Sequence, residues 1–176
     1  MKINAALVNP FVEAGIKVIK ELTNIDVRRG HLSIQEKPVP TYEVSIIIGI
    51  YGHLTGQVVY SMKKQVAVRL VQKILGEVNN QQLKEMFVDT LGEMANMITG
   101  NATALLSAKK DYMLKITTPA IVTGNQISVN LVPNPTVVLG MYTTYGPIEI
   151  NIALEEAAST ESGGPKKPSA GKPGGG

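Results

Sequence analysis

Apolar positions in the chain follow two spacings, one typical of helices and one typical of strands. In residues 4–23 they recur every three or four positions, which predicts an amphipathic helix. Pro10 either begins the main part of this helix or kinks a longer one, and Asn24 closes it. Residues 62–75 repeat the helical spacing, and Gly76 is expected to end that helix because glycine readily adopts a helix-terminating conformation.

The longest helical pattern begins at Asn79 or Asn80 and continues to Lys109. At 100° of rotation per residue, one side of this helix carries apolar residues, which are Phe87, Leu91, Met94, Ile98, Ala102 and Leu105. A narrow polar stripe on the opposite side consists of Asp89, Glu93, Asn96 and Gly100. Because the apolar side of an amphipathic helix is the buried one, we expect the stripe to face solvent or a partner.

Strand-like segments, alternating or continuously apolar, occupy much of the remaining chain. They cover residues 27–35, 43–51, 54–61, 113–117, 119–123, 127–132, 136–144 and 148–154. The turn residues at 51–56 predict a hairpin, and the aliphatic run 44–52 suits a central strand buried on both faces. Strands grouped between blocks of helix, without regular alternation, indicate an α+β fold.

The end of the chain differs in composition from the rest. Residues 157–176 contain no branched aliphatic or aromatic residue, so burial cannot offset the entropy of ordering them. They are predicted to be a disordered tail or a remnant of cloning, which leaves residues 1–156 as one domain. Three lysines and one glutamate give the tail +2 of the total charge of +3, and no basic stripe is present elsewhere. A nucleic-acid partner is therefore not expected.

Other compositional features exclude several kinds of chemistry. The chain has no cysteine, and its two histidines, His31 and His53, are too few for a histidine metal site, so no metal is expected. Neither a signal peptide nor a membrane-length apolar run is found, so we expect a cytoplasmic protein without a membrane partner. Gly52 and Gly56 lie in the predicted hairpin turn, where turn chemistry explains them better than a phosphate-binding loop does.

A polar stripe on a helix needs no functional explanation by itself. However, Gly92 and Gly100 lie on or beside the stripe, although each costs a helix roughly 1 kcal/mol relative to alanine. Glycine there leaves room for another backbone, and the flanking Met86 and Met97 suit an adaptable contact surface. Alternatively, Gly100 and Asn101 end the helix and the methionines belong to the edge of the core.

The positions of four residues carry a more specific signal. Asp89, Glu93, Asn96 and Pro119 are separated by three, two and twenty-two residues. This pattern resembles the signature of the CheX and CheC class of chemotaxis phosphatases, and the likeness extends over residues 1 to about 155. The single copy of the motif favours the one-site CheX type. The resemblance implies one long exposed helix and two further helices packed on a mainly antiparallel sheet.

The same resemblance implies an aspartyl-phosphate protein phosphatase, a hydrolase that acts on the phosphoaspartate of a CheY-like response regulator. It assigns Asn96 to positioning the attacking water and Glu93 to pairing with the regulator's lysine. The regulator supplies Mg²⁺, so no cofactor of the chain's own is expected. Residues expected to contact the regulator around this pair are Asp89, Gly92, Met97 and Gly100.

Two further expectations follow from the resemblance. CheX-like proteins are typically homodimers formed by strand exchange through a segment after the long helix, which implies a homodimer here. The alternative function is a non-catalytic module of the same fold that binds a response regulator, as flagellar switch proteins do, or that only dimerises. Pro119 either shapes the entry into the next strand or is an ordinary loop proline.

Overall fold

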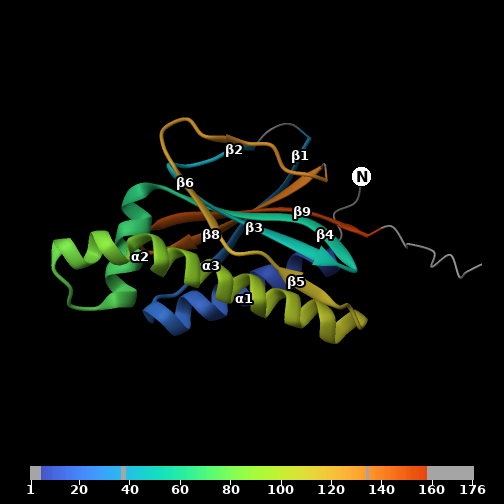
Figure 1. Cartoon of the computed structure of the whole chain (residues 1–176), viewed down its shortest axis with the longest axis horizontal. Coiled ribbons are helices and arrows are strands. Elements are labelled where there is room, and N and C mark those ends of the chain that lie inside the picture. The colour runs from blue at the N-terminus through green and yellow to red at the C-terminus, as the bar shows by residue number, and fades with distance from the viewer. Residues whose placement is uncertain (1–4, 37–38, 134, 158–176) are drawn as a thin grey trace, which may run out of the picture.

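The computed structural model describes residues 5–36, 39–133 and 135–157 (Figure 1). Its helices are α1 (Ala5–Thr23), α2 (Lys64–Leu75) and α3 (Asn80–Lys110). Its strands are β1 (Arg28–Gln35), β2 (Val39–Pro40), β3 (Val44–Gly52), β4 (Leu54–Met62), β5 (Leu114–Ile116), β6 (Ala120–Thr123), β7 (Ser128–Val129), β8 (Thr136–Thr143) and β9 (Gly146–Glu156). The predicted tail lies outside the described residues from position 158 onward.

The strands form one large antiparallel sheet in the order β1-β8-β9-β4-β3. Strands β5 and β6 pair with different stretches of the outer edge of β3, so they share one margin of the sheet. The three helices lie on one side of the sheet, and the short β2–β7 ribbon lies on the other (Figure 1). This arrangement confirms the predicted α+β class.

The core lies between the helices and the sheet. From β3, Ile46, Ile48 and Ile50 point into it and are fully or almost fully buried. Ile47 points to the opposite face and packs in a small cluster with Val59 beneath the β2–β7 side. The predicted central strand is therefore covered on both faces over most of its length, whereas its end at Tyr51 and Gly52 is exposed.

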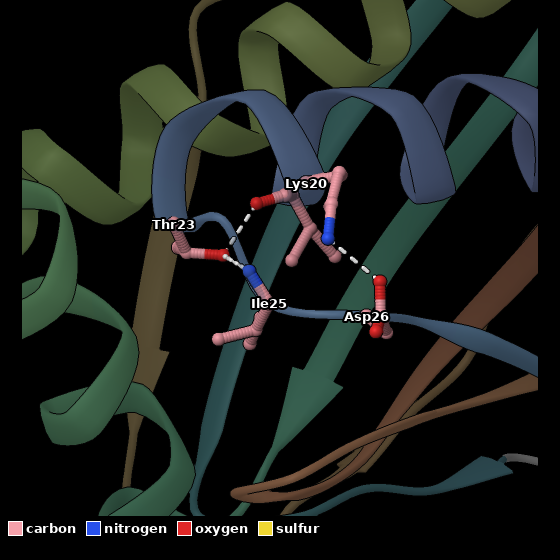
Figure 2. Close-up of polar contacts among 5 residues, drawn as sticks. Lys20, Thr23, Ile25 and Asp26 are labelled. Carbon is pink, nitrogen blue, oxygen red and sulfur yellow. Dashed lines mark hydrogen bonds and ion pairs between the residues drawn. The ribbon is translucent and has the colours of Figure 1, made fainter.

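Helix α1 begins five residues before Pro10, so the alternative in which this proline starts the helix is wrong. Its end is fixed by local contacts (Figure 2). The Thr23 hydroxyl donates to the Ile19 carbonyl and accepts from the Ile25 amide at 3.3 Å. Lys20 Nζ lies 2.7 Å from Asp26 Oδ1. These contacts turn the chain out of α1 and toward β1.

The observed bounds of two other predicted elements differ from the prediction because strand pairing determines where each element begins and ends. The helix predicted over residues 62–75 starts at Lys64, because Met62 belongs to β4 and pairs with Val44 and Ile148. The strand predicted over residues 127–132 shortens to Ser128–Val129, since β2 offers it only two partners. Leu131 beyond it is buried against the sheet without being in a strand.

Candidate active site on helix α3

Helix α3 is defined at both ends by residues of its own sequence. The Asn79 side chain accepts from the Gln82 amide, and the Gln82 side chain accepts from the Asn79 amide, which forms a capping box. The helix runs unbroken for 31 residues until Asp111 adopts the left-handed conformation with φ 53°. Gly100 and Asn101 therefore lie within the helix, and the alternative in which they end it is wrong.

One side of α3 is anchored in the core. Leu91, Met94, Ile98 and Ala102 are buried as predicted, whereas Phe87 and Leu105 are only half-buried. Beside them, the Tyr60 hydroxyl from β4 lies 2.8 Å from Thr99 Oγ1, which itself donates to the Ala95 carbonyl. Burial raises the pKa of Tyr60, and its hydroxyl thus remains a neutral donor to the helix.

The opposite side of α3 presents the predicted polar stripe. Asp89 and Glu93 are exposed, and Asn96 and Gly100 are half-buried. A Cβ placed on Gly100 would meet nothing within 4 Å. The side chains of Asp89, Glu93 and Asn96 make no hydrogen bond or ion pair with any residue that the structure describes. A carboxylate and an amide thus stand about one helical turn apart, and neither has a polar partner among the described residues.

Gly92 does not belong to this open surface. It is buried, and a Cβ there would lie 3.8 Å from Pro119 Cβ and 3.9 Å from Ile121 Cδ1. The expectation that Gly92 offers room to a partner is wrong, because the chain entering β6 already covers it. Pro119 packs at this crossing, immediately before β6, which favours its structural interpretation.

The two methionines beside the stripe differ in exposure. Met86 is 45% exposed, whereas Met97 is half-buried and packs against the main core. The Asn101 amide donates to the Met97 carbonyl at 2.8 Å, which directs this second amide along the helix and not outward. Asn96 and Asn101 are therefore the same residue type in different roles on one helix.

The two histidines lie away from the stripe. His53 Nδ1 accepts from the Met113 amide at 2.9 Å, and its ring stacks on Tyr112 with centroids 5.7 Å apart. Over the described ranges, no three His, Cys, Asp or Glu side chains gather as a metal site would require. No helix in the same part of the chain is long and apolar enough to cross a membrane.

Sequence reasoning missed the contact that positions this helix on the sheet. Tyr60 and Thr99 are 39 residues apart in the sequence. No pattern of neighbouring residues predicts a hydrogen bond between two side chains so far apart. The only signal was a tyrosine and a threonine at positions that the helical and strand spacing places inward. Spacing alone does not say that their hydroxyl groups meet.

Comparison with known proteins assigns the family. The model described as "Chemotaxis phosphatase CheX" matches residues 44–142, more than half of the chain. The chain belongs to the CheX family, as the four-residue motif indicated.

Individual relatives agree with this assignment. The CheY-P phosphatase CheX of Thermotoga maritima is 26% identical over 129 residues, which cover 72% of this chain and 81% of that protein. The crystal structure of a CheX from Desulfovibrio desulfuricans has 27% identity and a TM-score of 0.77, over 85% of this chain and 99% of the other. CheX in the CheX–CheY–BeF₃–Mg²⁺ complex from Borrelia burgdorferi has 25% identity and a TM-score of 0.72, over 85% and 97%.

Proposed function

We propose that this chain hydrolyses the phosphoaspartate of a CheY-like response regulator, with Glu93 and Asn96 as the catalytic pair. The observation that carries the proposal is the position of both side chains on α3, opposite the buried face and without a polar partner among the described residues. Membership of the CheX family and the likeness to a named CheY-P phosphatase support the reaction. The chain would then be an aspartyl-phosphate protein phosphatase.

The proposed hydrolysis requires no covalent bond between this protein and the phosphoryl group. Water attacks phosphorus, the bond between phosphorus and the aspartyl oxygen breaks, and aspartate and inorganic phosphate are formed. Positioning and charge stabilisation dominate catalysis of such transfers. Asn96 offers one acceptor and two donors, so its amide can hold a water in line with the leaving oxygen without changing its own protonation.

Glu93 has a different role in the proposal. Its carboxylate, about one turn from Asn96, pairs with the lysine of the regulator's active site. A partly desolvated ion pair fixes the docking register as well as adding attraction. Around the pair, Asp89, Met97 and Gly100 would contact the regulator, and Gly100 would allow its backbone to approach closely.

Mg²⁺ is assigned to the regulator in this proposal. The stripe carries the carboxylates of Asp89 and Glu93, and the described residues form no three-membered metal cluster around them. The cation would neutralise charge on the phosphoryl oxygens, while the chain contributes the water-positioning amide and the docking carboxylate.

We also propose that the protein is a homodimer in which a segment after α3 is exchanged between copies. Strands β5 and β6, which follow α3, are short and lie on one margin of the sheet. A sheet margin has unpaired backbone groups that a second chain can satisfy.

The decisive experiment measures decay of the phosphorylated regulators of the same cell with and without the protein. Asn96→Ala should lower the stimulated rate by about 100-fold or more, because the attacking water loses its positioning group. Regulator binding should persist. Asn101→Ala is the matched control, since it removes an amide that bonds the helix itself. Near-normal turnover by Asn96→Ala would overturn the assignment, and binding without any turnover by the natural protein would favour the non-catalytic alternative.

A further inference from the structure

Between β5 and β6 the chain leaves the edge of β3 and then pairs with it again. Strand β5 ends with Ile116 opposite Ile50 of β3. Strand β6 begins with Ala120 opposite Ile47. Residues 117–119, which we call the crossing segment, are thus three residues opposite two of β3, which is a bulge. Bulges redirect the side chains of a strand and are frequent beside functional sites.

Thr117 holds the crossing segment to β3 through Gly49. The Thr117 amide donates to the Gly49 carbonyl at 2.9 Å, and the Thr117 hydroxyl accepts from the Gly49 amide at 2.9 Å. The same hydroxyl donates to the Thr118 carbonyl at 3.2 Å. A Cβ on Gly49 would lie only 2.9 Å from Thr117 Cγ2, so any side chain at this position would displace Thr117. The two residues are therefore matched in both hydrogen bonding and shape.

The other end of the crossing segment packs on α3. Pro119 covers Gly92, where an added Cβ would lie 3.8 Å from Pro119 Cβ. Asn96 follows Gly92 by four residues and is rotated only about 40° from it around the helix axis, whereas Glu93 is rotated about 100°. Asn96 is half-buried, while Asp89 and Glu93 are exposed. The amide of the stripe thus lies next to the covered side of the helix.

The orientation of the Asn96 amide depends on this packing. Its side chain forms no hydrogen bond with any described residue, so no polar contact fixes its rotamer. Holding a water in line for attack requires an amide that is already oriented, and a displacement of about 1 Å can lower a rate about 100-fold. A rotamer without a polar partner is restricted by the groups packed beside it. The crossing segment covers that side of α3.

We propose that Thr117 is a positioning residue, which together with Gly49 fixes the crossing segment over Gly92 and thereby orients Asn96 toward the attacking water. This inference rests on the proposed function for the reaction. Thr117 acts through its neighbours, so its effect belongs in kcat and not in KM. In a strand-exchanged dimer the same contacts would form between copies, and the inference therefore does not depend on the oligomeric state.

The first test measures the decay of phosphorylated regulator over a range of regulator concentrations. Thr117→Val keeps the branched shape but removes the hydroxyl, and it should lower kcat about tenfold with KM unchanged. Thr117→Ser retains the hydroxyl and should keep kcat near the natural value. Thr117 is exposed, so both variants should fold, which urea unfolding verifies.

Thr143 provides the matched control, because its hydroxyl makes the same kind of contacts in the turn between β8 and β9. It accepts from the Tyr145 amide at 3.1 Å and donates to the Gly146 carbonyl at 2.8 Å. Thr143→Val should leave kcat unchanged. An equal loss of kcat in Thr143→Val and Thr117→Val would overturn the inference, because the loss would then come from general destabilisation.

The second test approaches the same contact from β3. Gly49→Ala leaves the Thr117 hydroxyl in place but adds a methyl group 2.9 Å from Thr117 Cγ2, so it should displace the crossing segment and lower kcat. Combining it with Thr117→Ser removes that Cγ2 and should restore most of the activity, since residues in contact do not act additively. Natural kcat in folded Gly49→Ala, or no recovery in the double variant, would contradict the proposed contact.

A third measurement does not require turnover. The side-chain amide signal of Asn96 in a ¹⁵N NMR spectrum, identified by its absence in Asn96→Ala, should move in Thr117→Val and stay in place in Thr143→Val. A lower kcat with an unmoved signal would overturn the inference, because Thr117 would then act without Asn96.

The outcomes distinguish this inference from the proposed function. Natural kcat in folded Thr117→Val overturns the role of Thr117, even where the loss of activity in Asn96→Ala supports the phosphatase. A moved Asn96 signal in a protein that hydrolyses no phosphorylated regulator supports the contact and overturns the phosphatase. Near-normal turnover by Asn96→Ala overturns both, because the amide then has no water to position.

Discussion

Gly92 and Gly100 occupy the same helix in opposite surroundings. Gly92 is covered by Pro119 and Ile121, while a Cβ on Gly100 would meet only open space. Both lie inside α3, where glycine is about 1 kcal/mol less favourable than alanine. Both glycines therefore destabilise α3, and only Gly100 lies on the face that is proposed to contact the regulator.

Gly100→Ala should raise the free energy of unfolding by about 1 kcal/mol and still weaken regulator binding, because the added methyl group stands where the partner backbone approaches. Denaturant unfolding and the KM for phosphorylated regulator measure the two effects. Gly92→Ala is the control. Its methyl group would make ordinary contact with Pro119, so it should leave KM unchanged. Equal KM values for Gly100→Ala and the natural protein would remove Gly100 from the interface.

Glu93→Lys should abolish both binding and turnover, because two like charges would face each other where an ion pair is proposed. Titration of a beryllofluoride-loaded regulator and the decay rate of its phosphorylated form report the two losses. Glu93 is exposed and forms no hydrogen bond or ion pair with the described part of the chain, so the fold should be unaffected. Full activity in this variant would exclude Glu93 from the site.

At the scale of elements, α3 is held both by its own end and by the sheet. The capping box at Asn79 is local, whereas the Tyr60 hydrogen bond to Thr99 joins β4 to the middle of the helix. The first contact fixes where the helix starts. The second fixes how it is rotated on the sheet, and therefore where Glu93 and Asn96 point.

Asn79→Ala should destabilise the protein by about 1 kcal/mol, because the Gln82 amide loses its acceptor at the helix start. Thermal or urea unfolding measures the change. Asn80→Ala provides the comparison, since Asn80 is exposed one residue further on and is not the capping residue. Equal free energies of unfolding for the two variants would show that the Asn79 cap does not stabilise the protein.

Tyr60→Phe should cost about 1 kcal/mol at neutral pH through loss of the hydrogen bond to Thr99. The natural protein should also lose stability above pH 10 in a way that this variant does not. Burial raises the pKa of Tyr60 above its ordinary value of 10.0, so the hydroxyl ionises first in the unfolded chain. Its contribution is complete below pH 10 and falls by up to about 1.4 kcal/mol per pH unit above it. Parallel pH profiles for the two proteins would contradict this.

Local chemistry explains which elements the sequence predicts well. The helix expected from Asn79 or Asn80 to Lys109 differs by one residue from α3, because its capping signals lie within a few residues of its ends. The stripe at Glu93 and Asn96 follows from helix geometry alone. The exception is Gly92, whose burial depends on a crossing by Pro119 that no helical spacing contains.

Non-local pairing explains the remaining differences. The expected strand 127–132 is short in the structure because its partner β2 is only two residues long and distant in sequence. The hollow of about 460 Å³ lined by residues at α2, α3, β3 and β6 likewise exists only in the complete fold. Spacing along one element cannot reveal a surface of that kind.

At the scale of the whole molecule, we expect a homodimer. One chain has a mass of 18.8 kDa, so twice that mass, about 38 kDa, should be measured by light scattering at micromolar concentration. The pairing that joins the copies would satisfy the sheet margin occupied by β5 and β6. A mass near 19 kDa throughout a dilution series from micromolar concentrations would contradict strand exchange.

The place of β9 in the sheet has a consequence for biosynthesis. This last described strand lies between β8 and β4, and thus in the interior of the sheet. In a nascent chain that lacks β9, the edges of β8 and β4 that pair with β9 in the complete sheet have no partner strand. We therefore expect the sheet to close only after the final strand has been translated, and a chain interrupted before Gly146 to expose the strand edges that attract chaperones and proteases.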